Sequence, residues 1–331
     1  MNAIDLHAHL VPRDVLRRWG MIRDAERGET QSGVAIRIGA QWLKVPDALL
    51  DPEALFRGDE AEGIGARVVS LPPFLLRYDL PEEDGVAYSR AMNEGLAALA
   101  AGSGGRVQVL ASVPLQSPRA AADELARAMQ ELGCAGAEIA TNVAGRAELD
   151  DPRLEPFWRS AASLRAIVLV HPHDVAGAGR MHAYHLRNLI GNPLETALAA
   201  ARLLFSGVLE RHPDLRVVLS HGGGALPWLV GRLERGFQVR PECRDGGERP
   251  GVLARRFYYD TVVHNADALR ALVGWMGSSQ VVLGTDFPFD MGDPRAVRAV
   301  QAAVEERAAR RAILVDNAQR LLDRGERLTS G

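Results

Sequence analysis

The chain has 331 residues, 47% of them hydrophobic and 24% charged, a composition typical of a globular protein. The formal net charge of −3 offers no basic field to attract nucleic acid or an anionic membrane, and no apolar run is long enough to span a bilayer. Only two cysteines occur, Cys134 and Cys243, without a CxxC pair. We therefore expect no disulfide framework, no thiolate metal site, and a reducing cytoplasmic location.

Short apolar, β-branched runs alternate with amphipathic stretches along the chain, which is the pattern of βα units and a parallel sheet. We expect them to close into a (β/α)8 TIM barrel formed by a single domain over residues 1–331, with an open, doubly wound sheet as the alternative. The eight predicted strands are Ala3–His9, Ala66–Leu71, Val107–Val113, Gly136–Ala140, Ile167–His171, Arg216–His221, Phe257–Asp260 and Gln280–Gly284.

A long insertion follows the first strand. Residues 10–50 form a segment too long for a simple βα loop, and we expect a small subdomain with antiparallel strands at Val34–Ile38 and Gln41–Val45. Further along, the Gly- and charge-rich segment Arg240–Arg255 is predicted to be a surface loop.

Two helices are marked clearly by the sequence. The first is Pro118–Leu132, with Ser117 as its N-cap and Gly133 after its end. The second is Pro193–Glu210, which ends before Pro213. Its apolar residues recur at helical spacing, at Leu194, Leu198, Ala201, Phe205 and Leu209.

Polar side chains stand at the ends of four predicted strands. His7 and His9 lie two apart in the first strand, so both point to the same side. His171, His221 and Asp286 follow three later strands. Because barrel active sites form at the carboxyl ends of the strands, we expect these groups to meet, although each histidine alone could be structural. Imidazoles with one carboxylate suit Zn²⁺, Fe²⁺ or Mn²⁺ and leave a position open for water.

Four segments carry a family resemblance. They are Ile4-Asp5-Leu6-His7-Ala8-His9, Val170-His171-Pro172, Ser220-His221-Gly222-Gly223-Gly224-Ala225-Leu226-Pro227 and Gly284-Thr285-Asp286-Phe287-Pro288-Phe289. These segments resemble the second amidohydrolase family, and within it the branch of aminocarboxymuconate-semialdehyde decarboxylases. The likeness runs nearly end to end and includes Gly179-Arg180-Met181 and Gly231-Arg232.

The resemblance implies a mononuclear metal site. Its ligands would be His7, His9, His171 and Asp286 around one divalent ion, Zn²⁺ in the first place, with Mn²⁺ or Fe²⁺ as alternatives. Asp286 would also take part in catalysis, and His221 would be the acid/base that exchanges a proton with the metal's water.

Dinuclear relatives use a carboxylated lysine on the fourth strand to bridge two metals. This chain has Glu138 there, and its only lysine, Lys44, lies elsewhere. The sequence thus supports the mononuclear form independently and disfavours a Schiff-base mechanism.

The resemblance also implies substrate contacts. Arg232 would reach a neighbouring subunit's site in a homodimer and grip a substrate carboxylate, while His173 and Phe289 would line the substrate site. Two features depart from the decarboxylase branch: His173 replaces a tryptophan, and no arginine occurs near Pro46, where Lys44 is the nearest cation. We therefore expect a related small-molecule unsaturated or aromatic carboxylic acid as substrate.

Three functions follow from these residues. The first is non-oxidative decarboxylation of such an acid. The second is metal-dependent hydrolysis of an amide, lactone or carbon–carbon bond with the same residues. The third, a non-catalytic barrel, would be indicated by loss of a ligand or of His221, and none is lost. No P-loop lysine and no GxSxG motif is present.

Overall fold

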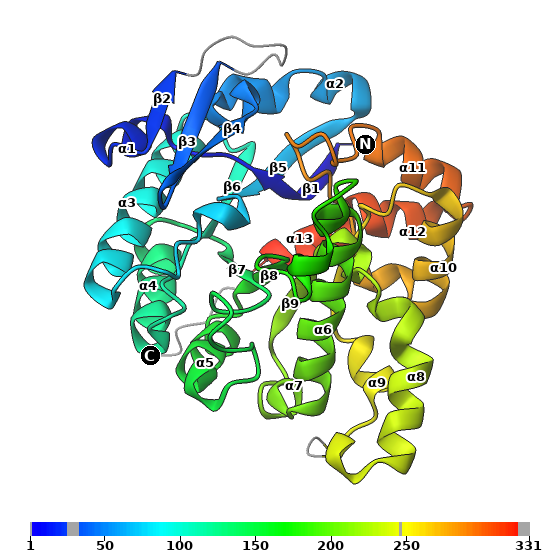
Figure 1. Ribbon diagram of the computed structural model, residues 1–331. Helices are drawn as coiled ribbons and strands as arrows, with labels where there is room; N and C mark the ends of the chain where they lie inside the picture. The colour runs from blue at the N-terminus through cyan, green and yellow to red at the C-terminus, as the bar shows by residue number, and fades with distance from the viewer. Residues whose placement is uncertain (1, 25–32, 245–246, 324–331) are drawn as a thin grey trace, which may run out of the picture.

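The central sheet of the protein, described here from a computed structural model that covers residues 2–24, 33–244 and 247–323, has eight parallel strands (Figure 1). Their order is β1-β5-β6-β7-β8-β9-β10-β11, which is also their order in the chain. All eight predicted strands are present, and β1, β7 and β8 have the predicted bounds. The strands are β1 (Ala3–His9), β5 (Ile64–Ser70), β6 (Val107–Ala111), β7 (Gly136–Ala140), β8 (Ile167–His171), β9 (Arg216–Leu219), β10 (Tyr258–Asp260) and β11 (Val281–Val282).

The sheet closes on itself. The segment around and after β11 runs beside β1, where the Leu6 amide donates to the Leu283 carbonyl at 2.8 Å and the His9 amide donates to the Phe287 carbonyl at 2.7 Å. These bonds join the first strand to the last and close the barrel. The predicted (β/α)8 barrel is confirmed, and the open doubly wound sheet was the wrong alternative.

Helices surround the barrel (Figure 1). No helix in the described part of the chain combines the length and apolarity that a bilayer crossing requires. The longer helices are α3 (Glu82–Ala101), α4 (Pro118–Glu131), α5 (Glu155–Ser163), α6 (Asn192–Phe205), α8 (Leu226–Val239), α10 (Ala266–Met276) and α11 (Ala296–Ala303). The shorter ones are α1 (Arg13–Arg18), α2 (Asp59–Glu62), α7 (Val208–Arg211), α9 (Pro250–Ala254), α12 (Arg307–Arg311) and α13 (Asn317–Leu322).

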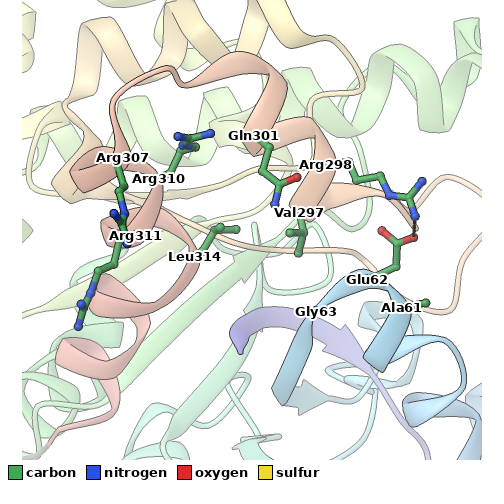
Figure 2. Close-up of a pocket in the computed structure, with 10 residues that line it drawn as sticks. All are labelled: Ala61, Glu62, Gly63, Val297, Arg298, Gln301, Arg307, Arg310, Arg311 and Leu314. Atoms are coloured by element: carbon green, nitrogen blue, oxygen red, sulfur yellow. Dashed lines mark ion pairs between the residues drawn. The ribbon is translucent and has the colours of Figure 1, made fainter. Parts of the chain in front are cut away.

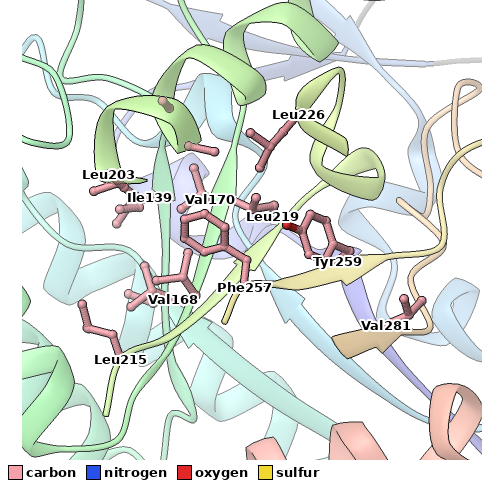
Figure 3. Packing of buried hydrophobic residues seen from close by; sticks show 14 of the residues in the cluster. Ile139, Val168, Val170, Leu203, Leu215, Leu219, Leu226, Phe257, Tyr259 and Val281 are labelled. Atoms are coloured by element: carbon pink, nitrogen blue, oxygen red, sulfur yellow. The ribbon is translucent and has the colours of Figure 1, made fainter. Parts of the chain in front are cut away.

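Alternating strand residues build two layers of core. One set fills the barrel, and Ala318 and Leu321 of α13 pack against it. The other set faces the helices, where Val168 and Val170 of β8 pack with Leu203 of α6 and Phe257 (Figure 3). The filled interior makes the barrel a rigid support for whatever its strand ends carry. The interior residues include Leu6, Val68, Leu110, Ile167, Leu169, Val218 and Val282.

The prediction of one continuous helix over Pro193–Glu210 was wrong. The chain forms α6 and α7 instead, separated at Gly207, whose φ of 72° is the left-handed conformation that glycine adopts without strain. Moreover, Leu194 and Leu198 of α6 are 48% and 39% exposed, because the buried face of this helix is formed mainly by alanines and by Leu203 and Leu204.

The insertion contains a three-stranded antiparallel sheet. Strands β3 (Val34–Ile38) and β4 (Gln41–Val45) have the predicted bounds, and β2 (Ile22–Asp24) pairs with β3. Buried residues of this sheet belong to the same apolar cluster as Phe287 and Phe289, which follow β11. The insertion therefore packs near the carboxyl ends of the barrel strands.

The described parts of the segment Arg240–Arg255, residues 240–244 and 247–255, contain regular structure where a surface loop was predicted. It contains the short 3-10 helix Pro241–Cys243 and α9, whose Leu253 is buried. The apolar residues of α9 pack against the barrel's helical layer, which the segment's charge-rich composition concealed.

Candidate metal centre

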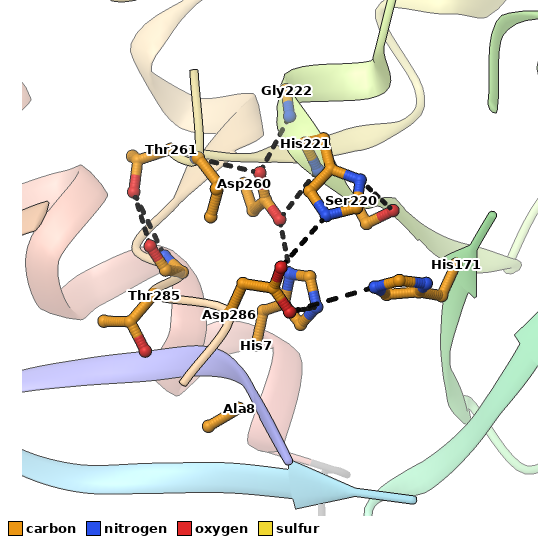
Figure 4. A network of polar contacts seen from close by, with 12 residues as sticks. His7, Ala8, His171, Ser220, His221, Gly222, Asp260, Thr261, Thr285 and Asp286 are labelled. Atoms are coloured by element: carbon orange, nitrogen blue, oxygen red, sulfur yellow. Dashed lines mark hydrogen bonds and ion pairs between the residues drawn. The ribbon is translucent and has the colours of Figure 1, made fainter. Parts of the chain in front are cut away.

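The four predicted ligands meet at the carboxyl ends of the strands, and Figure 4 shows three of them, His7, His171 and Asp286. His7 and His9 come from β1, His171 ends β8, and Asp286 follows β11; all four are buried. One potential ligand atom from each lies within 4.8 Å of the others, and this is the only such group among the described residues. Asp286 Oδ1 lies 3.1 Å from His9 Nε2, 3.3 Å from His7 Nε2 and 3.9 Å from His171 Nε2.

The donor set fits a single divalent ion. Three imidazole nitrogens and one carboxylate oxygen suit zinc, manganese or iron. The Nε2 atom of His171 is buried and has no hydrogen-bond partner, which is expected of an atom whose lone pair is kept for a cation. Burial lowers the pKa of His171 to about 3, so this ring is neutral and able to coordinate at neutral pH.

The electrostatics of the centre favour a positive charge. Burial alone would lower the pKa of His7, but Asp286 and Asp260 outweigh it and raise this pKa well above its ordinary value. Burial likewise opposes ionisation of Asp286, yet the surrounding histidines, His7 foremost, hold its pKa well below the usual range. In the metal-free protein a protonated His7 therefore supplies the positive charge that a bound cation would otherwise provide.

Asp260, the last residue of β10, supports the centre from behind. Its Oδ2 accepts from His7 Nδ1 at 2.6 Å and from the His221 amide at 2.9 Å, and its Oδ1 accepts from the Gly222 amide at 2.7 Å. Asp260 was not among the site residues predicted from the sequence. The available signal was its position, because Asp260 ends a predicted strand just as His171 does.

Glu138 lies beside the ligands without joining them. It is fully buried on β7, the fourth barrel strand, and its Oε2 accepts from the Ser70 hydroxyl and lies 3.8 Å from His9 Nδ1. Burial raises the pKa of Glu138, while His9 and Ser70 act in the opposite direction. Glu138 is outside the four-residue ligand group, in keeping with a mononuclear centre.

His221 is presented by a tight glycine turn. Its backbone is left-handed (φ 54°), as are Gly222 (φ 61°) and Gly224 (φ 59°). A Cβ atom at Gly224 would lie 2.2 Å from the Pro193 carbonyl oxygen, so only glycine fits there. The turn places His221 Nε2 3.3 Å from Asp286 Oδ2, where it can exchange a proton beside the metal position.

The predicted substrate residues fall in different places. The ring centroid of Phe289 lies 5.3 Å from that of His9 and 6.2 Å from that of Phe74, so these two phenylalanines form an aromatic wall next to the ligands. His173 lies in the loop after β8, partly buried, with its ring 3.8 Å from Asp174. Arg232 is exposed on α8, and no contact among the described residues brings it to the metal ligands of its own chain.

A hollow of about 430 Å³ lies at the amino end of β5, away from the histidines. Arg298 there pairs with Glu62 at 3.0 Å and Arg311 pairs with Asp316 at 3.1 Å. Figure 2 shows the four arginines of this pocket pointing in different directions, so they do not converge on a common ligand position. Its lining residues are Ala61, Glu62, Gly63, Val297, Arg298, Gln301, Arg307, Arg310, Arg311 and Leu314.

A closed parallel barrel with histidines and an aspartate gathered at its strand ends defines a class of metal-dependent barrel enzymes. The comparison with protein families narrows the class: the family model described as Amidohydrolase matches residues 4–324. The chain belongs to this amidohydrolase family, as the sequence resemblance predicted.

Individual relatives are decarboxylases. The chain is 32% identical, over 88% of its length and 82% of the relative's, to a 2-amino-3-carboxymuconate-6-semialdehyde decarboxylase of Dictyostelium discoideum. It is 29% identical, over 76% and 82% of the two lengths, to a gamma-resorcylate decarboxylase of Rhodococcus jostii.

Solved structures share the fold. A dihydroxybenzoic acid decarboxylase from Polaromonas sp. JS666, with bound manganese and the inhibitor 2-nitroresorcinol, superposes with a TM-score of 0.81 at 23% identity, over 98% of this chain and 97% of the other. A 2,6-dihydroxybenzoate decarboxylase from Rhizobium superposes with a TM-score of 0.80 at 24% identity, over 98% and 99% of the chains.

Proposed function

We propose that this protein is a metal-dependent, non-oxidative decarboxylase of an unsaturated or aromatic carboxylic acid. The observation that carries the proposal is the buried group of three histidines and Asp286 with His221 directly beside it, in a chain whose relatives are named decarboxylases. Hydrolysis with the same residues is the alternative, because the metal centre alone does not distinguish the two reactions.

The chemistry needs an electron sink and a proton. A bound divalent ion supplies a Lewis acid that stabilises negative charge developing on the substrate. When the carboxylate leaves as carbon dioxide, the bonding electron pair remains on the carbon atom, which must take up a proton. His221 Nε2, 3.3 Å from Asp286 Oδ2, is placed to hold that proton, and Asp260 fixes the backbone amides of His221 and Gly222.

We propose Zn²⁺ as the native ion. The nitrogen-rich donor set and the four-ligand arrangement suit zinc, with Mn²⁺ and Fe²⁺ as alternatives. Elemental analysis of the purified protein distinguishes the three. The substrate class is supported by the rings of Phe74 and Phe289, which meet edge to face and offer apolar aromatic contacts to an unsaturated or aromatic ring.

We also propose that the protein works as a homodimer. Exposed apolar side chains gather on helices α6, α8 and α10, with the rings of Trp228 and Trp275 in contact at 4.6 Å. A surface of this kind is typical of a subunit interface. Arg232 is exposed one helical turn beyond Trp228 on α8, a position from which it would enter a partner's site and bind a substrate carboxylate.

Subunit mixing tests the shared site. Chains carrying Arg232→Ala and chains carrying Asp286→Ala should each be inactive, because one lacks the carboxylate contact and the other a metal ligand. After random exchange, half the dimers are mixed and half of their sites are intact, so about a quarter of the wild-type activity should return. No recovery in dimers shown to have exchanged would contradict a shared site.

The reaction class is tested with a panel of carboxylated aromatic acids and muconates. We expect the metal-loaded protein to release carbon dioxide without incorporating solvent oxygen into the organic product. A product that carries ¹⁸O from labelled water in a new carboxylate would establish hydrolysis instead. Protein stripped of metal should be inactive in both cases and should recover when the ion is returned.

A further inference from the structure

Each histidine of the metal centre faces the ligand cluster with its Nε2 atom. His9 Nε2, for example, lies 3.2 Å from His7 Nε2 and 3.1 Å from Asp286 Oδ1. A histidine that coordinates through Nε2 must carry its remaining proton on Nδ1, and this proton needs a hydrogen-bond acceptor. The centre therefore requires three acceptors, one behind each ring.

Two of the acceptors are already in place. His7 Nδ1 lies 2.6 Å from Asp260 Oδ2, and His171 Nδ1 lies 3.2 Å from the Pro172 carbonyl oxygen. His9 is different, because its Nδ1 atom is buried and has no hydrogen-bond partner. A buried N–H left without an acceptor costs about 1–3 kcal/mol.

The carboxylate of Glu138 faces this atom. Its Oε2 is 3.8 Å from His9 Nδ1, and its Oε1 is also buried without a partner. Two unpaired buried polar atoms, one a donor and one an acceptor, thus belong to side chains in contact. A shift of about 1 Å brings the pair to hydrogen-bond distance. The Ser70 hydroxyl, which donates to Oε2, holds the carboxylate on this side of the ring.

We propose that Glu138 is the positioning residue for His9: it accepts the Nδ1 proton, fixes the ring with Nε2 toward the ion, and so tunes metal affinity. This inference rests on the metal centre of the proposed function. Glu138 thereby performs for His9 the role that Asp260 performs for His7, and the fourth barrel strand contributes to the centre without supplying a ligand.

The test separates metal affinity from folding. Glu138→Leu removes the acceptor at similar volume, whereas Glu138→Gln keeps an acceptor oxygen. Partners of this kind contribute ten- to hundredfold to metal affinity, so we expect Zn²⁺ binding in Glu138→Leu to weaken by that factor and in Glu138→Gln by only a few-fold. The control is Glu124→Gln, which alters a buried glutamate bonded to Asn93 and Arg127 and away from the ligands.

Three measurements decide the outcome: the Zn²⁺ dissociation constant by competition with a chromophoric chelator, the visible spectrum of the Co²⁺ form, and thermal unfolding of the metal-free protein. We expect Glu138→Leu to lose affinity and change the Co²⁺ spectrum while its metal-free melting temperature stays the same or rises, because a buried carboxylate has been replaced by an apolar group.

Two results would overturn the inference: wild-type Zn²⁺ affinity in Glu138→Leu, or equal losses of affinity in Glu138→Leu and Glu138→Gln. A wild-type protein that binds no divalent ion would instead refute the metal centre itself. Failure of this inference and failure of the proposed function are therefore distinguishable.

Discussion

Replacing Asp260 by asparagine should impair the metal centre through a residue that never touches the ion. The carboxylate accepts four N–H groups: His7 Nδ1 at 2.6 Å, and the amides of His221, Gly222 and Val262 at 2.9, 2.7 and 3.0 Å. An amide has only one oxygen. If that oxygen keeps Gly222 and Val262, its NH₂ group faces the ring of His7 and the amide of His221.

The consequence is a tautomer change. To accept from the new NH₂ group, His7 must move its proton to Nε2, the atom that faces Asp286 and would coordinate the ion. With the opposite amide orientation, the backbone amides of Gly222 and Val262 lose their acceptor, at a cost of about 1–3 kcal/mol each. We therefore expect Asp260→Asn to weaken metal binding ten- to hundredfold, or by about 1.4–2.8 kcal/mol.

The assay is chelator competition on metal-free protein, with thermal unfolding as the measure of folding. Asp59→Asn is the matched control, because Asp59 is also buried and ion-paired, with Arg67, but has no contact with the metal-site histidines. The control should lose stability and keep its affinity for metal. The reasoning is refuted if folded Asp260→Asn binds the ion within threefold of wild type.

Three further predictions follow from the site. His221→Ala should retain its metal but lose turnover by about 10²–10⁴-fold, and near-normal turnover would remove His221 from the mechanism. Metal binding at pH 7 should release a proton, because the raised pKa of His7 keeps the metal-free ring protonated. The affinity for metal should therefore rise with pH up to the pKa of His7, and the heat of binding measured by calorimetry should depend on the buffer. Gly224→Ala should lower the melting temperature and displace His221, whereas Gly231→Ala, with open space around its Cβ, should be tolerated; equal melting temperatures would contradict the required turn.

The sequence predicted most of the barrel because its strands are short, mostly apolar and largely buried runs, rich in β-branched residues in β8, β9 and β11. The same reasoning failed for α6, where helical spacing of Leu194 and Leu198 does not reveal which face is buried. The ligands could be predicted because each follows or ends a short apolar run, where a polar side chain is easily recognised. Asp260 and Glu138 were not selected as site residues because their roles depend on rings contributed by β1, far away in the chain.

The metal centre lies at the junction of the first and last barrel strands, so its ligands come from both ends of the barrel. His9 and Asp286 are 277 residues apart, and the Asp286 amide donates to the His7 carbonyl across the junction of the first and last strands. During synthesis from the amino terminus, the two early histidines leave the ribosome long before the aspartate exists. Capture of the ion by this full ligand set must therefore wait until the chain has been made at least as far as Asp286, so a bound ion indicates that the first and last strands of the barrel have been joined.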